Sequence, residues 1–236
     1  MKTLGKLVAL AAFAVAGAAH AAFGPGEMVI VLNSGDGSIS IVDPATRKEV
    51  KRVPVGKEPH HLMATPDNKE LIVANAASND LVFLNPLNGD ILRRIPNISD
   101  PYQIGYSPDK KWFLSASNRL DRVDIYHGGD FRLAKRIATG KVPSHIAFTA
   151  DSKLAFVTIQ ESNEFIAIDL EKQEVVWKMA TGKQPAGIWM TPDDKHLLVG
   201  ITAETHVDVF DWRARKMAKK TLTGPGAHNF VAQGDA

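Results

Sequence analysis

An internal repeat of 42 residues constrains the fold of this chain more than any other feature. The segment GKEPHHLMATPDNKELIVAN, residues 56–75, returns as GKVPSHIAFTADSKLAFVTI and again as GKQPAGIWMTPDDKHLLVGI. Three sets of residues keep this step without slippage: Pro59, Pro101, Pro143 and Pro185; Thr65, Ser107, Thr149 and Thr191; Lys69, Lys111, Lys153 and Lys195. A fixed period of about 40 residues indicates a repeat architecture.

Each unit contains four short runs rich in β-branched and aromatic residues, separated by Pro, Gly, Asn and Asp. In the first full unit we expect strands over residues 60–65, 71–74, 81–84 and 91–95. The second run of a unit is apolar at consecutive positions, as in Trp112-Phe113-Leu114, so both of its faces must be buried. The sequence therefore predicts an all-β fold, a β-propeller of four-stranded antiparallel blades, in preference to a β-sandwich with internal duplication.

The units also resemble the YVTN-type β-propeller repeats of exported bacterial proteins. The residues that carry the resemblance are VLN at 31–33, VAN at 73–75, FVT at 156–158, IVD at 41–43 and AID at 167–169. The resemblance covers Met28 to Asp235, although no literal Tyr-Val-Thr-Asn is present and a Gly-Gly turn interrupts the pattern between Asn118 and Asp130. It implies the propeller fold and leaves the chemistry open, because the members of that family are diverse.

The repeat divides the domain, residues 22–236, into a series of units. These are a partial unit 28–56, full units 57–98, 99–140, 141–182 and 183–224, and a terminal strand within 225–236. The partial unit lacks its innermost strand, so residues 227–231 could pair with residues 29–33 and close a five-bladed ring, which would remove exposed strand edges. Alternatively, the roughly five blades present are the front part of a seven-bladed propeller. We favour the second arrangement.

Residues 1–21 have the pattern of a secretory signal peptide, with Lys2 and Lys6, an Ala-rich apolar run and Ala19-His20-Ala21 as a small-x-small cleavage site. We therefore expect a periplasmic or secreted protein with no transmembrane anchor after removal of the leader. The remainder has 26 basic and 26 acidic residues, and this balance argues against a nucleic-acid partner. Because cysteine is absent, the exported domain must be stable through packing alone.

Two sets of residues follow the repeated proline, where the innermost strands should border the central channel. One set contains His60, Tyr102, Ser144, Ala186 and His228, and the other contains His61, Gln103, His145, Gly187 and Asn229. Adjacent side chains of a strand point to opposite faces, so only one set should line the channel. We expect the second set to do so, because Tyr102 and Ala186 of the first suit packing between blades.

These positions give the candidate ligand-binding residues of the channel: His61, Gln103, His145, Asn229, His60 and His228. Their imidazoles and amides could bind a metal, a haem-like cofactor or a small polar ligand, with His61 and His145 as the candidate metal ligands. The alternative is a hydrated polar channel, since no two of these residues have a local metal-ligand spacing. No cofactor is required by the sequence, and no catalytic residue is indicated.

The leading functional hypothesis is a ligand- or protein-binding scaffold, whose partner is an unidentified periplasmic protein or a small polar ligand. Such a scaffold could work beside a redox or quinoprotein system. The alternative is an enzyme or redox module similar to the propeller lactonases or to the haem-binding propeller domains of nitrite reductases. The first kind needs a carboxylate cluster, and the second needs an axial histidine with arginines for the propionates. Arg119 and Arg122 are the arginines near the expected ligand face.

Overall fold

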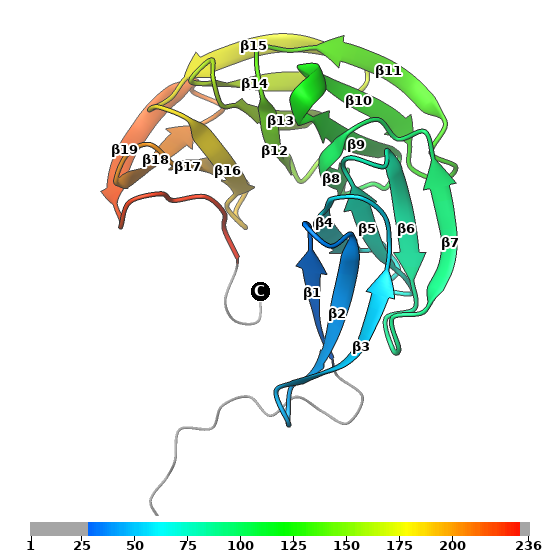
Figure 1. The fold of residues 1–236 in the computed structure, drawn as a ribbon. Coiled ribbons are helices and arrows are strands. Elements are labelled where there is room, and N and C mark those ends of the chain that lie inside the picture. Colours follow the sequence, from blue (N-terminus) through cyan, green and yellow to red (C-terminus); the bar gives the residue numbers. More distant parts are fainter. Residues whose placement is uncertain (1–27, 232–236) are drawn as a thin grey trace, which may run out of the picture.

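The computed structural model describes residues 28–231, which form five antiparallel sheets placed side by side in an open arc (Figure 1). The first sheet has three strands: β1 (Val29–Asn33), β2 (Ser38–Asp43) and β3 (Lys48–Pro54). The second contains β4 (Pro59–Ala64), β5 (Leu71–Asn75), β6 (Asp80–Leu84) and β7 (Ile91–Pro96). The third contains β8 (Pro101–Tyr106), β9 (Trp112–Ser117), β10 (Arg122–His127) and β11 (Leu133–Ala138). The fourth contains β12 (Pro143–Phe148), β13 (Leu154–Ile159), β14 (Glu164–Asp169) and β15 (Glu174–Ala180), and the fifth β16 (Pro185–Met190), β17 (His196–Ile201), β18 (His206–Asp211) and β19 (Lys216–Leu222).

The predicted all-β fold with four-stranded antiparallel blades is confirmed for the four complete sheets, and the first sheet lacks its innermost strand as expected. The innermost strands β4, β8, β12 and β16 begin at the repeated prolines, one period apart. Within residues 28–231 the helical structure consists of one 3-10 turn, η1 (Asn118–Leu120). The described part of the chain contains no helix that is long and apolar enough to span a membrane.

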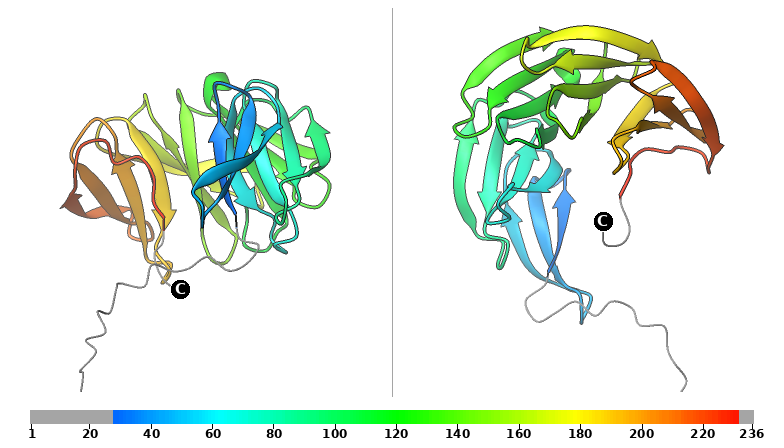
Figure 2. Two further views of the ribbon diagram at one scale, coloured as in Figure 1. Left: turned by 60° about the horizontal axis from the view of Figure 1, so that its bottom comes forward. Right: turned by 180° about the vertical axis from the view of Figure 1, so that it is seen from behind.

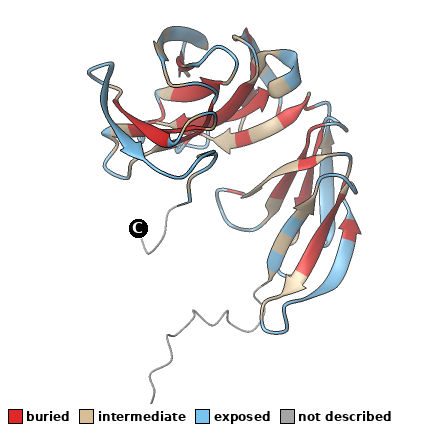
Figure 3. Ribbon diagram, turned by 60° about the vertical axis from the view of Figure 1, so that its left-hand side comes forward, coloured by how far each residue is buried: buried red, intermediate tan, exposed pale blue. Residues whose placement is uncertain are grey.

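The hydrophobic core lies between neighbouring sheets, and this explains the apolar runs of the second and third strands. Strand β9 is buried along its whole length, and so is β6, whereas the outermost strand β19 is exposed throughout. Figure 3 shows the buried positions concentrated in the middle strands of the sheets. One cluster joins Leu114 of the third sheet to Val157 and Ile168 of the fourth. Each blade is thus held by burial of apolar surface against its neighbours.

The ring is open in this structure, between the sheet β1–β3 and the sheet β16–β19 (Figures 1 and 2). Strand β1 pairs with β2 alone, and residues 225–231 form no strand, so the predicted terminal strand and its pairing with residues 29–33 are not present. The physical reason is that a strand needs a ladder of backbone hydrogen bonds to a neighbour, whereas the backbone of residues 227–231 receives one hydrogen bond from a strand, that of the Gly187 amide. The number of blades in the complete ring stays a prediction.

Residues 227–229 instead pack on two glycines of the last sheet. The Gly187 amide donates a hydrogen bond to the His228 carbonyl at 2.7 Å, and a Cβ at Gly187 would lie 2.4 Å from that oxygen. A Cβ at Gly200 would lie 2.6 Å from the Ala227 carbonyl oxygen. Only glycine permits such a close approach of backbone to backbone.

The position of this segment follows the repeat. In the preceding pair of blades, Thr158 of β13 donates a hydrogen bond from Oγ1 to the Ala186 carbonyl of β16, at 2.5 Å. One period later, the equivalents of these two residues are Gly200 and His228. Residues 227–229 therefore occupy the place that the innermost strand of a following blade would take.

Entry into each innermost strand passes through a left-handed residue directly before the proline. These residues are Glu58 (φ 56°), Asp100 (φ 45°), Val142 (φ 64°) and Gln184 (φ 55°). An Asn or Asp side chain of the preceding blade accepts the amide hydrogen of three of them: Asn79 from Asp100 at 2.8 Å, Asp121 from Val142 at 2.9 Å, and Asn163 from Gln184 at 2.8 Å. In these three blades the contact compensates for a strained backbone conformation and fixes where the innermost strand starts.

We expect Asp121→Ala to lower the free energy of unfolding by about 1–3 kcal/mol, because the amide of Val142 loses its acceptor. Asn at position 121 keeps an acceptor oxygen and also tolerates a positive φ. The free energy of unfolding of Asp121→Asn should therefore remain close to that of wild type. Urea denaturation followed by circular dichroism measures both changes. Equal midpoints for Asp121→Ala and wild type would show that the contact is not stabilising.

Candidate functional site

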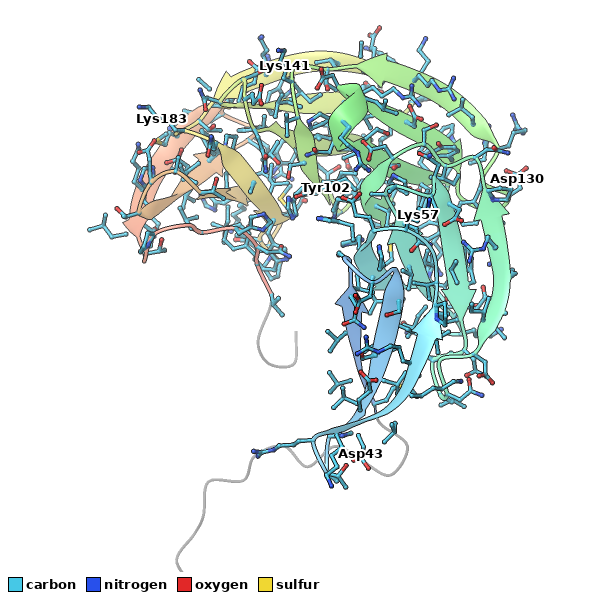
Figure 4. The ribbon with its side chains drawn as sticks, in the orientation of Figure 1. Asp43, Lys57, Tyr102, Asp130, Lys141 and Lys183 are labelled. Atoms are coloured by element: carbon cyan, nitrogen blue, oxygen red, sulfur yellow. The ribbon has the colours of Figure 1, made fainter. Side chains whose placement is uncertain are left out.

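Four aromatic rings lie in contact along the inner edge of the arc: His60, Tyr102, His145 and His228, called here the inner-edge cluster. His60 of β4 stacks on Tyr102 of β8 with ring centroids 3.7 Å apart. Tyr102 meets His145 of β12 edge to face at 6.3 Å, and His145 meets His228 at 5.2 Å. Figure 4 shows Tyr102 at the inner edge of the arc. Three blades and the terminal segment therefore contribute to one continuous cluster.

The cluster combines residues from both sets, so the regular alternation expected after the proline does not describe which rings meet. A β-bulge near the start of each innermost strand is the reason. On β4 the pairing passes from Pro59 opposite Asn75 to His61 opposite Ala74, which leaves His60 as an extra residue. The same shift occurs on β8 and β12. A bulge interrupts the alternation of side chains, so the rule for a regular strand does not hold here. Which set lines the channel stays a prediction.

The remaining candidate residues differ in their surroundings. His61 and Gln103 lie partly buried, and His61 Nδ1 and Gln103 Oε1 are buried without a hydrogen-bond partner. Asn229 is exposed, and its Oδ1 accepts the amide hydrogen of Phe230 at 2.8 Å. Tyr102 belongs to the cluster although the sequence assigned it to packing between blades, and its stacking on His60 shows that it does both.

Hydrogen bonds fix the orientation of two of the imidazoles. His60 Nδ1 lies 2.7 Å from the Tyr102 carbonyl oxygen. Because a carbonyl only accepts, this nitrogen carries the proton and the lone pair of His60 is on Nε2. His145 Nδ1 lies 2.8 Å from Ser144 Oγ, which in turn accepts a hydrogen bond from Gln160 Nε2 at 3.1 Å.

Burial keeps the imidazoles of the channel neutral. It lowers the pKa of His61 to about 4, with a smaller effect from the neighbouring His60. It lowers the pKa of His145 to about 3, and the nearby His228, His61 and His60 act in the same direction. Burial also lowers the pKa of His60, although its hydrogen bond to Tyr102 opposes this. At neutral pH these rings therefore offer lone pairs rather than positive charge.

The two arginines considered for the redox alternative have other partners in this structure. Arg119 forms ion pairs with Glu58 at 2.7 Å and with Asp100 at 2.6 Å, and the Arg122 side chain lies 2.9 Å from the buried Asp124 carboxylate. Among residues 28–231, no three or more His, Cys, Asp or Glu side chains are grouped so that they could hold a metal ion. The assignment of His61 and His145 as metal ligands stays a prediction.

Fold and inner surface together define a β-propeller protein. The sequence model of the YNCE-like beta-propeller family matches residues 2–236, and the chain belongs to this family. No curated protein sequence matches the chain significantly. Among solved structures, a chain of Kuenenia stuttgartiensis hydrazine synthase is similar with a TM-score of 0.59 and 17% sequence identity, over 86% of this chain and 86% of that chain. At this identity the likeness concerns the fold alone.

Proposed function

We propose that this protein is an exported, periplasmic or secreted β-propeller of the YVTN type that binds a small polar ligand at the inner-edge cluster. The observation that carries the proposal is the continuous contact of His60, Tyr102, His145 and His228, which come from four separate segments of the chain. Polar rings brought together from distant segments on the inner edge of the arc are a reasonable place for a ligand, because ligand sites combine apolar or aromatic surface with a few convergent polar groups.

Two buried atoms without partners support binding at this surface. His61 Nδ1 and Gln103 Oε1 follow the same repeated proline in neighbouring blades, and each is shielded from solvent. Leaving a buried polar group unpaired is costly, so such groups usually have a partner. A polar ligand or an ordered water in the channel would supply the missing hydrogen bonds.

The experiment expresses the full chain with its leader and recovers it from the periplasmic fraction. After denaturation, mass spectrometry of the released compounds and elemental analysis identify what was bound. We expect wild-type protein to release a compound in near-stoichiometric amount, and the double variant His60→Ala, His145→Ala to release none. His127→Ala is the matched control, because His127 lies against Trp112 in the third sheet with ring centroids 5.1 Å apart.

Three results would contradict the proposal. The binding function fails if wild-type protein releases nothing, or if the double variant releases the same compound in the same amount. Export fails if the protein stays in the cytoplasm and keeps residues 1–21.

A further inference from the structure

The imidazoles of His145 and His228 meet edge to face, at a spacing that also suits two ligands of one metal ion. Their ring centroids lie 5.2 Å apart and the ring planes meet at 81°. With metal–nitrogen bonds of about 2.0–2.1 Å and tetrahedral angles, two imidazoles on one ion have centroids about 5 Å apart. The rings are therefore as close as they would be around a shared ion.

The hydrogen bonds of His145 suit a metal ligand. Its Nδ1 faces Ser144 Oγ at 2.8 Å, and Gln160 holds that hydroxyl from the other side. If Nδ1 donates its hydrogen to the hydroxyl, Nε2 keeps the lone pair. Metal-binding histidines usually have one ring nitrogen fixed in this way by a neighbouring polar group.

His228 reaches this position because the last blade presents small residues there. Ala186 and Gly187 take the places that are His60 and His61 in the second blade. The hydrogen bond from the Gly187 amide then fixes the backbone of His228, whose side chain is exposed while His145 is buried. His145 is thus fixed within the buried part of the fourth blade, while His228 is accessible to solvent.

We propose that His145 and His228 together bind one borderline divalent metal ion, Cu²⁺ or Zn²⁺, whose other positions are open to water or to a small ligand. This inference rests on the proposed function of the inner-edge cluster and names the class of its ligand. Imidazole nitrogen suits copper and zinc, and two protein ligands leave room for exchange at the ion. His228 replaces His61 as the partner of His145, because the rings of His145 and His228 are in contact.

The test titrates untagged, metal-free protein with Cu²⁺ and separately with Zn²⁺, using isothermal titration calorimetry, and records electron paramagnetic resonance of the copper form. We expect one ion per chain and nitrogen couplings from two imidazoles. His145→Ala and His228→Ala should each weaken binding at least about tenfold, while His127→Ala leaves it unchanged. His228 lies on an exposed segment outside the sheets, so its variant keeps the fold.

A second variant tests the position of His228 without removing an imidazole. Gly187→Val would place side-chain atoms where the His228 carbonyl now lies, so it should displace the segment and weaken binding to the same degree as His228→Ala. Unchanged binding in His228→Ala, or binding lost equally in His127→Ala, would overturn the inference. If wild-type protein releases an organic compound but binds neither ion, this inference fails and the proposed function stands. If it releases no compound and binds neither ion, both fail.

Discussion

Replacing Phe113 by alanine is expected to lower the free energy of unfolding by about 3–5 kcal/mol. Phe113 of β9 is fully buried, and its ring contacts those of Tyr106 at 4.9 Å, Phe131 at 5.0 Å and Tyr126 at 6.3 Å. Removing it leaves a cavity in the core between the second and third blades, which neighbouring side chains fill only in part. Chemical denaturation followed by tryptophan fluorescence measures the loss.

The control for this variant is Leu87→Ala. Leu87 is 75% exposed in a turn of the second blade, so shortening it should change the free energy of unfolding by less than about 0.5 kcal/mol. A loss below 1 kcal/mol for Phe113→Ala would mean that the third blade can repack around the missing ring, contrary to the close packing described here.

Replacing Asp124 by alanine is expected to be nearly as damaging, with a loss of about 3 kcal/mol. The carboxylate of Asp124 is fully buried on β10, 2.9 Å from Arg122 Nε and 3.6 Å from Arg136 Nε, and Tyr126 Oη donates to it at 3.3 Å. Without the Asp124 carboxylate, the guanidinium groups of Arg122 and Arg136 lose their negative partner. Breaking a buried ion pair usually costs about 3–5 kcal/mol, and we expect the lower value because both arginines are partly exposed to water.

Asp130→Ala is the matched control for Asp124→Ala. Asp130 also pairs with an arginine of the third blade, Arg132 at 3.8 Å, but both side chains are exposed. An exposed pair contributes about 0–1 kcal/mol, so the same substitution should have little effect there. Thermal unfolding measures the stability lost in each of the two variants. Equal losses would show that the burial of Asp124 does not determine how much its ion pairs stabilise the fold.

The strands could be predicted from the sequence because the same pattern of apolar runs and turn residues occurs in several units. The first full unit was expected to have strands over 60–65, 71–74, 81–84 and 91–95, and it has β4 to β7 within one or two residues of these bounds. Consecutive apolar residues in the second strand correctly indicated burial on both faces, since β9 is buried throughout. Strand bounds and burial depend on the order of residue types within a unit, and this order is repeated from unit to unit.

The arrangement of the site depends on contacts that a single strand does not encode. The bulge at His60 and Tyr102 is defined by pairing with the neighbouring strand, so regular alternation could not predict which rings meet at the inner edge. The state of residues 227–231 likewise depends on whether a partner strand lies beside them. One signal was available: Asn79, Asp121 and Asn163 recur at the period and mark the residues that hold the strand entries.

The contacts between blades run in chain order. Tyr102 of the third blade provides the carbonyl for His60 of the second, Ala186 of the fifth for Thr158 of the fourth, and His228 beyond it for Gly187. In such a linear array, each unit is stabilised mainly by its immediate neighbours. A finished blade is therefore a template on which the next innermost segment docks. A chain that is delivered amino-terminus first can assemble blade by blade, before its last residues are available.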